Sequence, residues 1–116
     1  MDLSKLRAED QTPVGKVADY LTAQGLEVKL VGSALIGDEK YNDVDILVNG
    51  PVDLLLRTRN ALLLEKPLGD EYNVRHLGGP QGYGGIQKVD RFKIQAGKTS
   101  IDLSLNIYYL TTLNLN

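Results

Sequence analysis

Two segments of the chain alternate apolar and polar residues, and this period of two predicts half-buried β-strands. One face of residues 100–107 is apolar and is formed by Ile101, Leu103, Leu105 and Ile107. The opposite face of the same segment carries Asp102, Ser104 and Asn106. In the second segment, residues 43–49, the apolar face is formed by Val44, Ile46 and Val48. Each strand can therefore pack into a core on one side while it presents acids on the other.

The rest of the chain predicts two helices and further strands around these two. A helix is expected from the cap Thr12 and Pro13 to Gly25, and a second one over residues 53–65 before Pro67. Strands are expected over residues 26–32, 71–77, 88–95 and 100–109, the last two joined by a turn at residues 96–98. Gly78–Gly85 predicts a mobile loop, and residues 110–116 are left unassigned. This order predicts an α+β (mixed α/β) fold: a small mixed sheet with helices packed on one face.

Composition limits the classes of protein that fit. A chain of 116 residues predicts a single domain, 1–116, with a core over about 13–108. There is no cysteine, which excludes disulfides and thiolate metal sites. The N-terminus is polar, and no apolar run reaches the roughly 18 residues of a membrane span, so we expect a cytoplasmic protein without membrane contact. A net charge of −2 argues against broad binding to nucleic acid.

One local basic cluster leaves a choice open. It consists of Lys88, Arg91, Lys93 and Lys98. A solvated face of the predicted hairpin is favoured over a local nucleic-acid patch.

Three acids on polar strand faces predict a cation site. Asp43 and Asp45 project to the same face of one strand and repel each other, and a hard divalent cation such as magnesium offsets that repulsion. Asp102 lies on the polar face of another strand. If the two strands are neighbours, three carboxylates converge, and such a set can hold two metal ions around a phosphate and accept a proton from a hydroxyl.

Gly32 and Ser33 follow a predicted strand and complete this arrangement. Glycine lets a phosphate approach the backbone closely, and the serine hydroxyl and nearby backbone N–H groups can donate to phosphate oxygens. The sequence therefore predicts a phosphate site beside the acids.

At these residues the chain resembles the nucleotidyltransferase superfamily, which includes DNA polymerase beta, the tRNA CCA-adding enzymes, kanamycin nucleotidyltransferase and the minimal nucleotidyltransferases. The matching residues are Val31-Gly32-Ser33, a gap over residues 34–42, Asp43-Val44-Asp45-Ile46, and Ile101-Asp102-Leu103. The resemblance covers roughly Val14 to Ile107, and it includes the helix before the first strand and the helix after the second.

The resemblance implies a magnesium-dependent enzyme that transfers a nucleoside monophosphate from a nucleoside triphosphate such as ATP to a hydroxyl, with release of pyrophosphate. Asp43, Asp45 and Asp102 would be the catalytic and metal-binding acids of a one- or two-metal site, where Mn²⁺ can replace Mg²⁺. Gly32 and Ser33 would bind the nucleotide. The acceptor would be a protein, an RNA or other nucleic acid, or a small molecule.

The alternative is a non-catalytic or regulatory module on the same fold, such as the antitoxin-like half of a toxin–antitoxin pair. Some minimal members of the superfamily pair with a separate helical HEPN protein, and this chain has little room for a further substrate-binding domain. Its partner would be such a protein or a second copy of the chain.

Three other patterns predict nothing catalytic. Ala96–Ser100 resembles the end of a P-loop, but Phe92 stands where its first glycine is needed, so a hairpin turn is expected. Residues 38–43 fail as an EF-hand, because Lys40 occupies a ligand position. His76, the only histidine, has no partner visible in the sequence and is expected to be a surface residue and not a catalytic or substrate-binding one.

Overall fold

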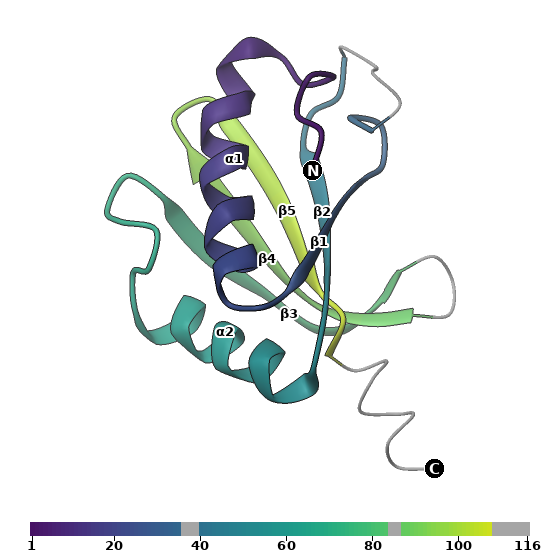
Figure 1. The fold of residues 1–116 in the computed structure, drawn as a ribbon, viewed down its shortest axis with the longest axis vertical. Helices are drawn as coiled ribbons and strands as arrows, with labels where there is room; N and C mark the ends of the chain where they lie inside the picture. Colours follow the sequence, from purple (N-terminus) through teal and green to yellow (C-terminus); the bar gives the residue numbers. More distant parts are fainter. Residues whose placement is uncertain (36–39, 84–86, 108–116) are drawn as a thin grey trace.

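The computed structural model describes residues 1–35, 40–83 and 87–107, and it is a mixed α+β fold of two helices and five strands (Figure 1). The elements in chain order are α1 (Ala8–Ala23), β1 (Glu27–Val31), β2 (Val44–Asn49), α2 (Val52–Leu64), β3 (Asn73–Tyr83), β4 (Gln87–Ala96) and β5 (Thr99–Leu105). The predicted fold class and the predicted turn between β4 and β5 are confirmed.

All five strands form one sheet in the order β1-β2-β5-β4-β3. β2 and β5 run parallel, whereas the other neighbours are antiparallel. β5, the last strand in sequence among the described residues, therefore lies between β2 and the β3–β4 hairpin. This order makes the two acid-bearing strands direct neighbours.

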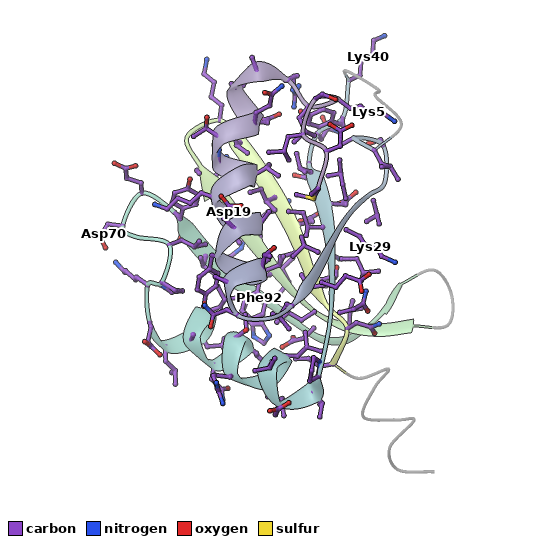
Figure 2. All side chains as sticks on the ribbon, in the orientation of Figure 1. Lys5, Asp19, Lys29, Lys40, Asp70 and Phe92 are labelled. Carbon is purple, nitrogen blue, oxygen red and sulfur yellow. The ribbon has the colours of Figure 1, made fainter. Side chains whose placement is uncertain are left out.

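Both helices pack on the same face of the sheet, as predicted. Arg59 of α2 donates a hydrogen bond to Asp90 of β4, and Asp10 of α1 accepts one from the Thr99 hydroxyl of β5. The two strand residues, Asp90 and Thr99, lie on the same face of the sheet as the buried Leu103. Phe92 is fully buried on this face, between the sheet and the helices (Figure 2). The other face of the sheet carries Asp45 and Asp102, away from the helices.

Helix α1 begins at Ala8, several residues before the predicted cap at Thr12. Pro13 lies inside the helix and has no N–H to offer the Glu9 carbonyl, but the hydroxyl of Thr99 lies 3.3 Å from that oxygen. Asp10 in the first turn is buried against Tyr41 and Thr99. The prediction of the helix start was wrong because contacts with distant residues hold the extra turn in place.

The predicted mobile loop at Gly78–Gly85 is also wrong over Gly78–Tyr83, which belong to β3. Two register shifts, between His76 and Gly78 and between Gly78 and Gln81, take up the irregular backbone, and Gly78 has φ +92°. β3 is an edge strand, where a proline that cannot donate a hydrogen bond is tolerated. Gly84 and Gly85 lie outside the described residues, as does the predicted strand beyond Ile107.

Across the described residues, no helix combines the length and the apolar character that a membrane crossing requires.

Candidate carboxylate site

The sheet brings together the three acids that the sequence singles out. Asp45 on β2 and Asp102 on β5 are paired positions of the parallel ladder, so their side chains project side by side. They do so from the face of the sheet opposite the two helices, which we call the open face. Asp43 lies one residue before β2 and shares that face. All three side chains are only partly buried.

Two cations from β4 face these acids, and the sequence prediction missed them. Lys93 Nζ lies 2.9 Å from Asp43 Oδ1 and 3.0 Å from Asp102 Oδ1. Arg91 Nη2 lies 3.4 Å from Asp102 Oδ2. The Ser100 hydroxyl donates to Asp43 Oδ1 at 2.6 Å. The basic cluster is therefore neither a solvated hairpin face nor an exposed patch at these two residues, because both pair with the acids.

A signal for Lys93 was present in the sequence. The turn between β4 and β5 consists of two residues, Gly97 and Lys98, and pairing outward from it places Lys93 opposite Asp102. The hairpin register alone therefore aligns a cation with the third acid.

The acids differ in their electrostatic environments. Burial, followed by the charges of Asp102 and Asp43, raises the pKa of Asp45 to about 6. Burial also opposes ionisation of Asp43, but hydrogen bonds from Ser100 and Lys93 outweigh it and hold the pKa of Asp43 below its ordinary value. Lys93 and Arg91 together balance the charges of Asp43 and Asp102, and the remaining negative charge is that of Asp45.

Gly32 lies directly against Asp45. Gly32 has φ +76°, and a Cβ atom built on it would lie 2.4 Å from Asp45 Oδ2. This backbone conformation and this lack of space both require glycine. Ser33 follows as an exposed residue in the same turn, where the Leu35 N–H donates to the Gly32 carbonyl. The structure therefore places Gly32 of the predicted nucleotide-binding pair beside Asp45, with Ser33 next to it in the same turn.

We expect Gly32→Ala to lower the free energy of unfolding by about 2–3 kcal/mol, through the strain of a positive φ and the clash with Asp45. Gly69→Ala is the matched control, because Gly69 has φ +97° but nothing within 4 Å of the added Cβ. Urea denaturation of both variants measures the difference. Equal losses would show that Gly32 does not contact Asp45 closely.

A buried network ties α1 to both segments that hold Asp43. Asp10 accepts hydrogen bonds from the Tyr41 hydroxyl, from the Thr99 hydroxyl at 2.7 Å and from Arg7 Nε at 3.2 Å. Tyr41 lies two residues before Asp43, and Thr99 precedes Ser100, which bonds to Asp43. Asp10 therefore helps to position Asp43 without belonging to the carboxylate site.

The donor set suits a divalent cation, although no cage for one is already formed. Carboxylate oxygens are the ligands that magnesium prefers, and Asp102 Oδ1 is buried without a hydrogen-bond donor in bonding geometry among the described residues. Within that same part of the chain, however, no three acidic or histidine side chains are already arranged to enclose a metal ion. The Lys93 ammonium stands between two of the three acids.

His76 lies on the other face of the sheet and is exposed, as predicted, but it has a partner that the sequence does not reveal. Its Nε2 is 2.6 Å from Oδ1 of the fully buried Asp90, whose other oxygen accepts a bond from Arg59 at 2.6 Å. The His76 ring packs at 4.8 Å from that of Phe92. This cluster joins α2 to the sheet and does not contribute to the carboxylate site.

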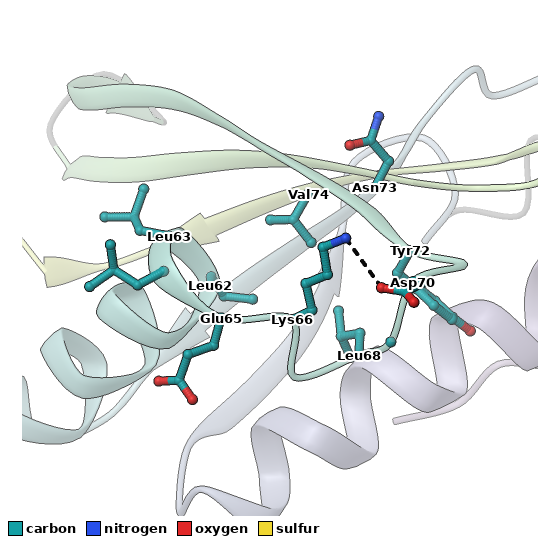
Figure 3. Close-up of a pocket in the computed structure, with 11 residues that line it drawn as sticks. Leu62, Leu63, Glu65, Lys66, Leu68, Asp70, Tyr72, Asn73 and Val74 are labelled. Carbon is teal, nitrogen blue, oxygen red and sulfur yellow. Dashed lines mark hydrogen bonds and ion pairs between the residues drawn. The ribbon is translucent and has the colours of Figure 1, made fainter.

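A hollow of about 380 Å³ at the C-terminal end of α2 is also separate from the acids (Figure 3). Leu62, Leu68, Tyr72 and Val74 line its apolar part, and Lys66 pairs with Asp70 at 3.2 Å. It offers apolar surface and one ion pair, and none of the three acids lines it.

Comparison with known proteins adds no relative to this description: no family model, curated protein or solved structure matches the chain.

Proposed function

We propose that the protein is a magnesium-dependent nucleotidyltransferase. The proposal is carried by one observation: Asp45 and Asp102 are paired on neighbouring parallel strands, with Asp43 on the same open face. Gly32 beside Asp45 supports it, because it places a close-approach turn where the triphosphate would lie. The resemblance of these residues to the nucleotidyltransferase motif points in the same direction.

In the proposed reaction, an acceptor hydroxyl oxygen bonds to the α-phosphorus of a nucleoside triphosphate. The bond from that phosphorus to the oxygen that bridges to the β-phosphate breaks, and pyrophosphate leaves with the electron pair. Asp102 is assigned to accept the hydroxyl proton. Bound Mg²⁺, held by the three acids, would supply the neutralisation of phosphate charge that this chemistry needs. Gly32 and Ser33 would orient the triphosphate through backbone N–H groups and the hydroxyl.

The test is nucleotide transfer from each of the four α-³²P-labelled nucleoside triphosphates to the protein itself, to RNA and to co-purified proteins. We expect labelling that requires Mg²⁺ or Mn²⁺ and falls at least about a hundredfold in Asp43→Asn, because each metal-binding acid contributes several kcal/mol to stabilisation of the transition state. Asp19→Asn is the matched control, since Asp19 points outward from α1 (Figure 2). Undiminished transfer by Asp43→Asn would contradict the proposal.

A stable complex with a helical protein partner, without metal-dependent transfer in any of these reactions, would support the regulatory module instead.

A further inference from the structure

Lys93 occupies the position between the acids where a cation is most favourable. Its ammonium lies 2.9 Å from an oxygen of Asp43 and 3.0 Å from an oxygen of Asp102, and 23% of its side chain is exposed. These two acids come from different strands, β5 and the segment before β2, so the ammonium bridges across the sheet. A single positive charge here does what a divalent cation would do: it offsets the repulsion between neighbouring carboxylates.

Lys93 and a metal ion cannot both use the same oxygens. Asp43 Oδ1 already accepts hydrogen bonds from Lys93 and from Ser100, and Asp102 Oδ1 faces the ammonium. A metal ion that binds these oxygens must therefore displace the ammonium, both for lack of space and because like charges repel. This competition explains why the carboxylates suit a metal ion although the described residues do not already enclose a site for one.

The structure also provides room for the displaced side chain. A hollow of about 240 Å³ over β3 and β4 is lined by Lys93 together with Asn73, Arg75 and Gln95, and none of the three acids lines it. The side-chain amides of Asn73 and Gln95 offer oxygen acceptors for an ammonium. Lys93 can thus leave the acids by rotation of its own flexible side chain, without movement of β4.

From this geometry we infer that Lys93 is an internal counter-ion that competes with the divalent cation for Asp43 and Asp102, and that metal binding releases its ammonium from the acids. The inference rests on the proposed function, because it concerns the same three acids. It goes further because Lys93 is not one of the motif residues, and it would determine the metal concentration at which the site is occupied.

The test uses Mn²⁺ alone, titrated into the purified protein at pH 7.5 and followed by the electron paramagnetic resonance signal of the free ion. We expect Lys93→Met to bind Mn²⁺ about tenfold or more tightly than the wild type, because the competing charge is gone while the side-chain length is kept. Lys29→Met is the matched control. Lys29, which is labelled in Figure 2, lies on the same face of the sheet on β1 next to β2. It pairs with Glu27 at 3.3 Å and not with the acids of the site.

Each outcome of the titration decides something. Tighter binding by Lys93→Met with less than about a twofold change in Lys29→Met supports the inference. Equal affinities of the wild type and Lys93→Met overturn it and leave the proposed function standing. Failure of both proteins to bind Mn²⁺ overturns both proposals.

A second measurement needs no variant and covers the case in which Lys93→Met does not fold. The wild-type protein is treated briefly with an amine-acylating reagent, with and without saturating Mg²⁺, and modification of each lysine is measured by mass spectrometry. We expect Mg²⁺ to increase modification of Lys93 relative to Lys29, because the ammonium is released from its carboxylate partners. Unchanged or reduced modification of Lys93, with Mg²⁺ bound, would overturn the inference.

Discussion

Asp45→Asn is expected to abolish nucleotide transfer and at the same time to make the protein more stable above pH 6. The loss of transfer should be at least about a hundredfold, because under the proposed function the variant removes one of the three carboxylates that would hold the metal. The gain in stability follows from the environment of Asp45, whose charge is opposed by burial and by the neighbouring Asp102 and Asp43. An acid that destabilises the folded protein at its position is typical of a functional site.

The pH dependence of this effect has a defined sign. The pKa of Asp45 is about 6 in the folded protein and about 3.9 in an unfolded chain, so between these values the folded state binds more protons. Stability of the wild type relative to Asp45→Asn therefore falls as the pH rises from 4 to 6. The full shift corresponds to about 3 kcal/mol, which solvent screening at this half-exposed side chain reduces to about 1 kcal/mol. Urea denaturation of both proteins at pH 4 to 8 measures it.

The adjacent acid provides the control for this prediction. The pKa of Asp43 lies below its ordinary value, so ionised Asp43 stabilises the fold, and Asp43→Asn should lower stability at pH 7. The two variants should thus change stability in opposite directions, although both remove an acid that is proposed to hold the metal. Saturating Mg²⁺ should then stabilise the wild type more than either variant. Destabilisation by both substitutions to the same extent would contradict the charge distribution described above.

Asp10→Ala is expected to lower the free energy of unfolding by about 3–5 kcal/mol, the largest effect on stability predicted for this chain. The Asp10 side chain is only 3% exposed and accepts bonds from Tyr41, Thr99 and Arg7. Its removal leaves three buried or half-buried donors without their acceptor. It also releases both segments that hold Asp43, so Mn²⁺ affinity should fall together with stability.

The contribution of Asp10 should also depend on pH. Burial alone would raise the pKa of Asp10, but the hydrogen bonds from Tyr41, Thr99 and Arg7 outweigh it and lower the pKa. Its stabilisation is therefore present above the unfolded pKa, and is lost as the pH falls below about 4 through the folded value. Glu9→Ala, an exposed neighbour in the same helical turn, should change stability by less than about 0.5 kcal/mol. Urea denaturation at pH 3 and pH 7 distinguishes the two variants. A small loss of unfolding free energy in Asp10→Ala at pH 7 would contradict the importance of this hydrogen-bond network.

The alternation of apolar and polar residues was sufficient to predict β2 and β5 and to place the acids on the polar faces of these strands. Asp45 and Asp102 project from one face because the side chains of a strand alternate, and Leu103 is buried behind them for the same reason. Whether β2 and β5 are neighbours in the sheet could not be predicted from the sequence. It depends on β5 entering the sheet beside β2, which is a choice among topologies and not a property of either segment.

The predictions that failed concern residues whose conformation is decided by distant partners. Helix α1 starts early because Asp10 is held by Tyr41 and Thr99, which are 31 and 89 residues away. The segment Gly78–Tyr83 is a strand because β4 offers it a partner, despite its glycines and proline. Ser104 on the polar face of β5 and Asn106 just after the strand are also less exposed than polar residues usually are, since both are buried. Tertiary contacts overrode local propensity in each case.

The position of β5 in the sheet has a consequence for synthesis of the protein. Asp43 and Asp45 leave the ribosome before Lys93 and Asp102, which follow with the β4–β5 hairpin that must dock against β2. A nascent chain therefore carries two unpartnered acids and an open edge of β2 until residue 105 has emerged. The three acids come together only after β5 has docked beside β2, so the proposed site forms late in folding.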